Sequence, residues 1–310
     1  MTILLLTISS AEYGLGHLSR SQNLATSIRA NKHEVILIDI YKNQEFTFYN
    51  GSKRTVKLQF KKIKKSGVKK IIVDLPFQIS IDELENFLGS FDLYGIDDIS
   101  DKRLYYTKIF YPYVGNPHNL IWDLRSSVKT FCGSKYAILN PYLDQLKRNR
   151  KIKTEGVLVS FGGSDPCNLR HVFLTSDIPL SYEFTLNLGP LILEEKRQPD
   201  LNVKIVRSTT SKQFLDLLSV HSKIICSFGV TVYEALSLKK QVIAVCLSPD
   251  HLRSAKKISE TYENFSFVEK RDFLNNPAII FDLLDTFSGK YSEWPNSDYV
   301  NIECVKEICE

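Results

Sequence analysis

The segment ILLLTISSAEYGLGHLSR, residues 3–20, decides the fold. It begins with the apolar run Ile3–Thr7, continues through a polar loop that contains Gly14 and Gly16, and leads into the amphipathic segment Leu18–Arg29. A short apolar strand, a glycine loop and a helix in this order open a βαβ unit. The segment therefore predicts a parallel sheet, with the glycine loop at the carboxyl end of its first strand.

The same alternation of strands and helices continues along the chain and restarts after the charged, glycine-free segment Asp144–Glu155. We expect further strands at Glu34–Ile40, Lys70–Asp74, Leu93–Asp97, Gly156–Phe161, Glu183–Leu188, Asn202–Val206, Lys223–Ser227 and Gln241–Val245, and helices at Ser211–Leu218, Thr231–Leu238 and Asp250–Ser259. The pattern predicts two α/β domains, an N-terminal Rossmann-like domain over residues 1–148 and a C-terminal one over residues 149–310, facing each other across a cleft.

The composition indicates an ordinary globular chain, with 43% hydrophobic and 24% charged residues among 310. The net charge of +5 comes from one stretch, Gly51–Val73, which holds nine basic residues and no acid. Without it the chain has 31 basic and 35 acidic residues, since 40 less nine is 31, and this argues against a protein that wraps nucleic acid. We interpret Lys53–Lys70 as a solvated charged face, or as a peripheral membrane contact if the protein transfers a group to a lipid acceptor.

The six cysteines form no C-x-x-C pair and no cluster with metal-ligand spacing. The apolar run at the N-terminus is short and no signal cleavage site follows it, and no window approaches the ~18 to 20 apolar residues of a membrane span. We therefore expect a cytoplasmic protein with buried free thiols and no integral membrane span.

The first loop places His17 at the start of a helix, directly after Gly16. The positive end of a helix dipole favours the neutral imidazole, which can accept a proton, so His17 is a candidate general base. The alternative is a helix cap or a packed histidine. Ser19, followed by Arg20, stands where the dinucleotide fingerprint G-x-G-x-x-G would have its third glycine, so NAD binding is disfavoured.

The second loop, Ser160–Asn168, exposes consecutive amides at Gly162, Gly163 and Ser164 and is a candidate cradle for phosphate. It lacks the Lys-Ser/Thr of a P-loop. The alternative is a tight turn in which Ser164 or Asp165 caps a helix starting at Pro166.

The third and fourth loops offer further polar groups. In the third, Ser227 and Gly229 precede Thr231 and Glu234, and the carboxylate could bind two ribose hydroxyls, although T-x-x-E is also a plain capping box. In the fourth, either Asp250 caps a helix, or Asp250 and His251 face the cleft.

Three motifs together, G-x-G-H-x-x-R at residues 14–20, S-F-G-G-S-D-P at 160–166 and S-x-G-x-T-x-x-E at 227–234, resemble a known family. The chain is similar over about residues 1–260 to the UDP-sugar hydrolases of pseudaminic acid biosynthesis, which have the GT-B fold and are related to the lipid II N-acetylglucosaminyltransferase. The stretches G-I-D-D at 95–98 and C-G-S-K-Y-A-I-L at 132–139 fit the hydrolases better than the transferase.

The resemblance implies an enzyme that splits the anomeric C–O bond of a UDP-linked 2,4-diacetamido-2,4,6-trideoxy sugar with inversion, without metal or cofactor. It implies that His17 is the base, and it makes Asp250 a second catalytic candidate. The expected substrate-binding residues are Gly14, Gly16, Arg20, Asp98, Tyr136, Gly162, Gly163, Ser164, Ser227, Gly229, Thr231, Glu234 and His251.

The chain departs from the family at two places. Leu75 and Pro76 follow Asp74 where the family has an aromatic residue, and Asp250 and His251 replace Asn-Gln. A carboxylate beside a diphosphate would repel it unless His251 or Arg253 compensates. Two alternatives remain open: an inverting glycosyltransferase that uses a UDP-sugar donor, and a sugar-nucleotide sensor without turnover.

Overall fold

The computed structural model describes residues 1–9, 15–40, 54–57, 66–76, 79–82, 90–111, 127–148, 155–192, 202–287, 292 and 300–310. The chain divides into two compact units, Met1–Pro141 with Val300–Glu310, and Tyr142–Tyr299. The second unit differs from the predicted C-terminal domain, residues 149–310, at both of its ends. Helix α3 (Leu143–Arg148) belongs to the second unit, while helix α10 (Ile302–Cys309) returns to the first.

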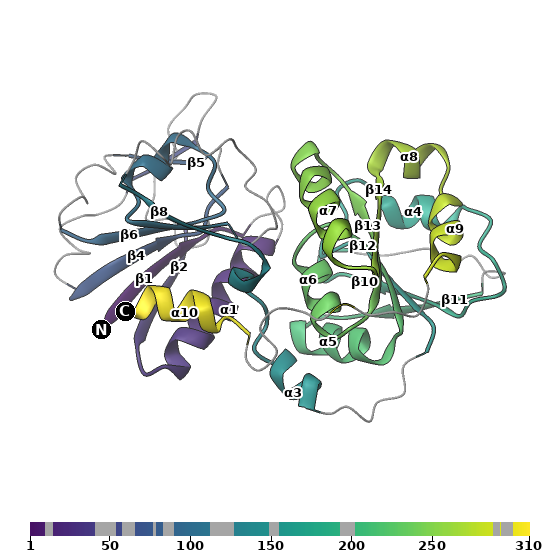
Figure 1. The fold of residues 1–310 in the computed structure, drawn as a ribbon, viewed down its shortest axis with the longest axis horizontal. Coiled ribbons are helices and arrows are strands. Elements are labelled where there is room, and N and C mark those ends of the chain that lie inside the picture. Colours follow the sequence, from purple (N-terminus) through teal and green to yellow (C-terminus); the bar gives the residue numbers. More distant parts are fainter. Residues whose placement is uncertain are drawn as a thin grey trace. The chain divides into compact units, whose positions relative to one another are not determined.

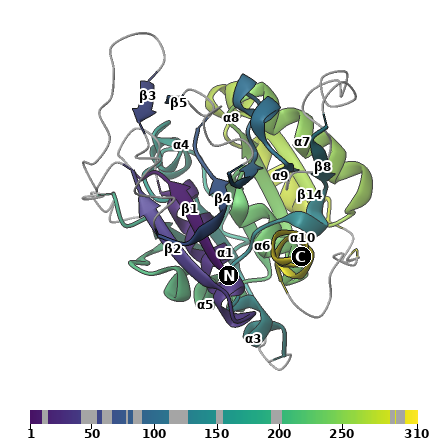
Figure 2. The same ribbon diagram turned by 90° about the vertical axis from the view of Figure 1, so that its left-hand side faces the viewer.

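The first unit is built on a six-stranded, wholly parallel sheet, in which β1, β2 and β4 lie side by side (Figure 2). The strand order is β2 (Glu34–Asp39), β1 (Thr2–Thr7), β4 (Val68–Val73), β6 (Asp92–Ile96), β7 (Lys108–Tyr111) and β8 (Lys129–Cys132). Two short strands, β3 (Arg54–Lys57) and β5 (Ile79–Asp82), form a separate parallel pair. The predicted strands of this half are confirmed to within two residues at each end.

Each face of this sheet carries its own core, because successive side chains of a strand point to opposite faces. Ile3 and Leu5 of β1 pack with helix α1 (Gly16–Ala30) and α10, whereas Leu4 and Leu6 pack on the other face. Figure 1 shows α10, in yellow, beside the purple α1. The C-terminal helix therefore completes the core of the first unit.

Two lysines of the sheet hold the end of α10. Lys70 Nζ donates to the Ile308 carbonyl at 2.6 Å, and Lys108 Nζ donates to the Glu307 carbonyl at 2.6 Å. A helix C-terminus exposes unsatisfied carbonyls and a partial negative charge, so these ammonium groups stabilise it. Burial lowers the pKa of Lys70, which is 7% exposed, whereas Lys69 is exposed. The prediction of a solvated face is therefore wrong for Lys70, and half of Lys53–Lys70, namely residues 53 and 58–65, lies outside the described residues.

The second unit contains a second six-stranded parallel sheet. Its order is β11 (Val203–Arg207), β10 (Phe184–Leu188), β9 (Val157–Ser160), β12 (Lys223–Ser227), β13 (Gln241–Cys246) and β14 (Phe265–Glu269). Its helices are α3, α4 (Leu169–Leu174), α5 (Ser211–Val220), α6 (Val230–Ser237), α7 (Pro249–Thr261), α8 (Lys270–Asn275) and α9 (Ile279–Asp285).

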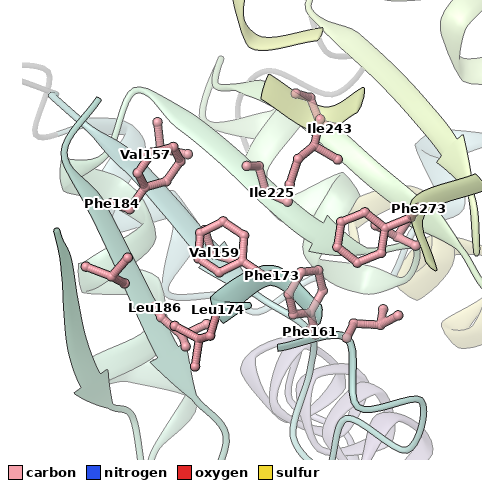
Figure 3. Packing of buried hydrophobic residues seen from close by; sticks show 14 of the residues in the cluster. Val157, Val159, Phe161, Phe173, Leu174, Phe184, Leu186, Ile225, Ile243 and Phe273 are labelled. Atoms are coloured by element: carbon pink, nitrogen blue, oxygen red, sulfur yellow. The ribbon is translucent and has the colours of Figure 1, made fainter. Parts of the chain in front are cut away.

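Phenylalanine rings pack among aliphatic side chains in the core on one face of this sheet (Figure 3). Phe173 of α4 packs edge to face on Phe184 of β10, with ring centroids 5.6 Å apart, and Phe161 lies 5.9 Å from Phe273 of α8. All six cysteines are free thiols, as predicted, and Cys226, Cys246 and Cys304 are buried. Within the described ranges, no helix has the length and apolar character of a membrane span.

Candidate functional site

Four neighbouring strands of the first sheet, β2, β1, β4 and β6, end in polar residues at one edge. Because the strands are parallel, Asp39, Ser9, Asp74 and Asp97 all lie at the carboxyl edge of the sheet. Ser9 donates a backbone hydrogen bond to Asp39 at 3.1 Å, and its hydroxyl also bonds this carboxylate. This is the edge at which ligands bind in open α/β sheets.

His17, the second residue of α1, pairs with Asp74 at this edge. Its Nδ1 lies 2.8 Å from Asp74 Oδ1, and its side chain is 25% exposed while that of Asp74 is fully buried. A carboxylate accepts hydrogen bonds only, so Nδ1 carries the proton and Nε2 keeps a free lone pair. No described residue hydrogen-bonds to Nε2. The arrangement is that of an oriented general base.

Two further residues of α1 bind the same carboxylate. Arg20 donates from Nη2 to Asp74 Oδ1 at 2.5 Å and from Nε to Oδ2 at 3.1 Å, and the Ser21 hydroxyl donates to Oδ2 at 2.9 Å. Burial alone would raise the pKa of Asp74, but the Arg20 charge and the His17 hydrogen bond hold it well below its usual range. Asp74 therefore stays ionised, and Arg20, expected as a substrate-binding residue, is 4% exposed and fixes it in place.

Asp97 is a second carboxylate beside Arg20, with its Oδ2 3.5 Å from Arg20 Nη1 and its side chain 26% exposed. Its φ is 55°, a left-handed conformation that few residues other than glycine adopt. Burial raises the pKa of Asp97 to about 6, against the opposing charges of Arg20 and His17.

The next residue, Asp98, points inward and is 1% exposed. It accepts hydrogen bonds from the Tyr106 hydroxyl at 2.7 Å and the Ser100 hydroxyl at 2.6 Å, and pairs with Lys102 at 3.3 Å. Asp98, predicted to bind substrate, is therefore a structural residue that fixes the turn after β6. Tyr136 also packs in the core, with its ring centroid 5.4 Å from that of Phe131.

In the second unit, the predicted anion loop follows β9 and packs tightly against the end of β10. Gly162 has a φ of 89°, and Leu191 donates a backbone hydrogen bond to Gly163 at 3.0 Å. A Cβ placed on Gly189 would lie 2.5 Å from backbone atoms of Gly162 and Gly163. The backbone conformation of this loop therefore depends on glycine at position 189.

The helix after this loop starts later than predicted. Helix α4 begins at Leu169, not at Pro166, and the Asp165 carboxylate accepts from the backbone N–H groups of Leu169 at 2.9 Å and Arg170 at 3.0 Å. The Asp165 carboxylate is therefore hydrogen-bonded to the first amides of α4, and it is Asp165, not Ser164, that accepts from this helix end. The amides of Gly162, Gly163 and Ser164 stay the predicted anion cradle of this edge.

The loop after β12 brings Ser227 and Gly229 to the same carboxyl edge. Gly229 is the N-cap of α6, and no side chain caps that end. Thr231 is the second residue of the helix, so the capping-box interpretation of Thr231 and Glu234 is wrong. Glu234 lies in the second turn and is 8% exposed. Ser227 Oγ lies 3.7 Å from a Cβ placed on Gly162, so the loops after β9 and β12 are adjacent.

At the start of α7 the N-cap is Ser248, whose hydroxyl accepts from the His251 backbone at 3.2 Å, so the capping prediction for Asp250 is wrong. Asp250 is 47% exposed and pairs with Arg253. His251 Nδ1 accepts from the Leu247 backbone N–H at 3.4 Å, and its ring lies 5.2 Å from that of Phe228. Burial lowers the pKa of His251, so the neutral imidazole offers Nε2–H as a donor.

The structure thus brings His17 and Arg20 together at the carboxyl edge of the first unit's sheet, and the loops of Gly162 and Gly229 together at the carboxyl edge of the second unit's sheet. Gly14 lies outside the described residues. Gly16 is the first residue of α1. Leu75, at the first departure from the family, is buried in the core. In the described ranges, no group of three histidine, cysteine or acidic residues is placed to hold a metal ion. Sequence reasoning missed Asp74 and Asp97, although each directly follows an apolar strand.

No protein-family model matches the chain. An uncharacterized protein of Methanocaldococcus jannaschii is 29% identical over 300 residues, which cover 85% of this chain and 60% of that protein. The chain thus spans well under two thirds of the length of this curated relative.

Solved structures of low sequence identity share the fold. A UDP-GlcNAc 2-epimerase from Neisseria meningitidis bound to UDP-GlcNAc matches with a TM-score of 0.58 and 11% identity, over 100% of this chain and 98% of that one. MurG from Acinetobacter baumannii matches with a TM-score of 0.58 and 11% identity, over 99% of both chains. The kitacinnamycin glycosyltransferase gives a TM-score of 0.56 and 10% identity, over 90% of each. The chain therefore has the predicted GT-B-like α/β fold, with two six-stranded parallel sheets.

Proposed function

We propose that this protein is an enzyme that acts on a UDP-sugar, and that it hydrolyses the bond between the anomeric carbon and the diphosphate. The observation that carries the proposal is the His17–Asp74 pair, with Nδ1 held at 2.8 Å by a buried carboxylate and Nε2 without a partner among the described residues. A histidine held in this tautomer at the carboxyl edge of a sheet is suited to general-base catalysis.

In the proposed reaction, His17 Nε2 takes a proton from water as the water oxygen attacks the anomeric carbon. A new C–O bond forms on the face opposite the diphosphate, and the bond to the diphosphate oxygen breaks, so UDP leaves with the electron pair and the configuration inverts. The charge that develops on the imidazole is stabilised by Asp74, which stays ionised because Arg20 lies beside it. His17 then returns its proton to solvent.

The second unit is proposed to bind the UDP. Backbone amides of Gly162, Gly163 and Ser164, with the N-terminus of α6 at Gly229, would stabilise the leaving diphosphate. Glu234 would accept hydrogen bonds from the ribose hydroxyls. Two structural neighbours are UDP-GlcNAc 2-epimerases described in complex with UDP-GlcNAc, which supports a UDP-sugar as ligand.

A glycosyltransferase is the second candidate, because the fold is also that of MurG and of the kitacinnamycin glycosyltransferase. In that case His17 would deprotonate an acceptor hydroxyl in place of water. The two functions differ in one requirement, which is the acceptor.

The deciding experiment incubates the protein with UDP-linked 2,4-diacetamido sugars in oxygen-18 water without any acceptor, and identifies the products by mass spectrometry. The hydrolase predicts UDP release and one labelled oxygen at the sugar C1. Release that requires an added sugar or lipid would establish the transferase. An altered UDP-sugar would indicate epimerisation, and binding of UDP without turnover would indicate a sensor.

Substitution of the base separates catalysis from binding. His17→Ala and His17→Asn should lower kcat by about 10²- to 10⁴-fold with little change in the Kd for UDP, as expected for a general base. His171→Ala, on the exposed surface of α4, is the matched control and should keep wild-type kinetics. Equal losses of turnover and UDP affinity would mean that His17 is a structural residue.

A further inference from the structure

Asp97 is not used in the reaction described above, although it lies beside the proposed base. It directly follows β6, whose neighbour β4 ends at Asp74, so the two carboxylates stand on adjacent strand ends. Arg20 contacts both of them, with two hydrogen bonds to Asp74 and one longer contact of 3.5 Å to Asp97. The two carboxylates differ in exposure, since Asp74 is fully buried and Asp97 is 26% exposed.

The charge balance of this cluster leaves one negative charge in excess. The Arg20 cation is matched by the Asp74 carboxylate, and His17 is neutral in the form that serves as a base. When ionised, Asp97 therefore carries a charge that no further described cation of the cluster matches. A neutral ligand group with N–H or O–H donors satisfies such a carboxylate, whereas a diphosphate would be repelled.

The surrounding loop holds Asp97 in this position. Its backbone N–H donates to the Phe110 carbonyl at 2.8 Å, and the following Asp98 is held by Tyr106 at 2.7 Å and, through its carbonyl, by the Tyr111 hydroxyl at 3.0 Å. The Tyr106 ring can pack here because residue 95 is glycine, since a Cβ on Gly95 would lie 2.4 Å from that ring. A left-handed residue other than glycine persists only where its neighbours fix it.

We propose that Asp97 is a substrate-contacting residue, whose carboxylate accepts hydrogen bonds from an N–H or hydroxyl of the sugar while His17 acts on the attacking water. The inference rests on the proposed function and deepens it, since it assigns the sugar to the carboxylate edge of the first unit. Among the described residues, the ionisable groups that face Asp97 are Arg20 and His17 from α1 and Asp74 from the end of β4.

The inference predicts a specific pH profile. Protonation removes an acceptor from Asp97, and its pKa is about 6, so kcat/KM should fall as the pH is lowered through this value. A variant that cannot ionise at position 97 should therefore lack this step in its plot of log kcat/KM against pH.

The test compares wild type, Asp97→Asn and Asp97→Ala in UDP release from a UDP-sugar between pH 4.5 and 8, with UDP affinity measured by calorimetry. Asp97→Asn should lower kcat/KM by about 10- to 100-fold, chiefly through KM, because it removes hydrogen bonds to a charged acceptor. Its profile should lack the step near pH 6, and its Kd for UDP should stay within about twofold of wild type. Asp92→Asn, an exposed acid at the opposite end of β6, should behave as wild type.

The outcomes separate this inference from the function on which it rests. If wild type releases no UDP from any UDP-sugar, the proposed function fails before the variants are compared. If wild type is active and Asp97→Asn keeps its KM and the step near pH 6, the Asp97 inference alone is overturned. A parallel loss of UDP affinity and turnover in Asp97→Asn would also overturn it, because that pattern indicates a damaged fold.

Discussion

Replacement of Asp74 by asparagine is the sharpest test of the His17–Asp74 pair. The carboxylate is fully buried and accepts four hydrogen bonds, two from Arg20 and one each from His17 and Ser21. Asparagine has nearly the same shape but carries no charge, and its amide can donate to His17 Nδ1. That exchange would move the imidazole proton to Nε2, the nitrogen that must accept the proton from water.

The expected losses follow from these contacts. Removing one partner of a buried ion pair costs about 3 to 5 kcal/mol, and Asp97 at 3.5 Å from Arg20 offsets part of this, so we expect about 3 kcal/mol in urea unfolding. Because the pKa of Asp74 is depressed in the folded state, this stabilisation exists above the ordinary carboxyl pKa and is lost on acidification. The stability difference from wild type should shrink below a pH of about 4. The wrong tautomer should lower kcat by about 10³- to 10⁴-fold.

Two comparisons make the result specific to the pair. Ser21→Ala removes one hydrogen bond to the same carboxylate, so it should cost about 1 kcal/mol and lower kcat by less than about tenfold. The double variant His17→Ala with Asp74→Asn should turn over no more slowly than His17→Ala alone, because residues that act as a unit are not additive. Fully additive losses, or a near-normal kcat in a destabilised Asp74→Asn, would refute the reasoning.

Three further predictions concern the second unit. Gly189→Ala should weaken UDP binding by about tenfold in calorimetry, because its Cβ would displace the Gly162 loop, and unchanged binding would contradict the assignment of that loop to phosphate. Glu234→Gln should reduce the preference for UDP over 2′-deoxy-UDP in competition binding, and a preserved preference would place the ribose elsewhere. Burial lowers the pKa of His221, so the unfolded chain binds more protons than the folded one, and the free energy of unfolding should rise with pH below the ordinary histidine pKa of about 6.5. The urea midpoints of His221→Gln at pH 5 and pH 7 should therefore differ less than those of wild type. An equal difference in the two proteins would contradict this.

The sequence predicted the elements well because each one depends on local pattern. The segment at residues 3–20 gives strand, loop and helix from periodicity alone, and β12 was predicted to the residue at Lys223–Ser227. Helix starts were less certain, since neighbouring residues compete for the cap. Ser248 is the N-cap of α7 in place of Asp250, and Gly229 is the N-cap of α6 in place of Thr231.

The site was only half predictable for a different reason. His17 follows a glycine in the first loop, which is a local signal, but its partner Asp74 is 57 residues away in the sequence. The contact depends on β4 lying next to β1, and strand order is not a local property. The return of α10 to the first unit is also a matter of long-range packing. The different exposure of the neighbours Asp97 and Asp98 also goes with contacts distant in sequence, since the Asp97 N–H donates to Phe110 and the Tyr111 hydroxyl donates to the Asp98 carbonyl.

The residues that follow the strands explain why two sheets of the same kind would recognise different parts of one substrate. In the first unit, the strands around β1 end in carboxylates, among them Asp74 and Asp97, which accept hydrogen bonds from neutral donors. In the second, the central strands run into Gly162 and Gly229, whose backbone amides donate to anions. A UDP-sugar carries a diphosphate at one end and N–H and O–H donors at the other. The chemistry of the two edges supports our proposal that the second unit binds the diphosphate and the first unit the sugar, because a diphosphate at the first edge would lie beside the carboxylate of Asp97.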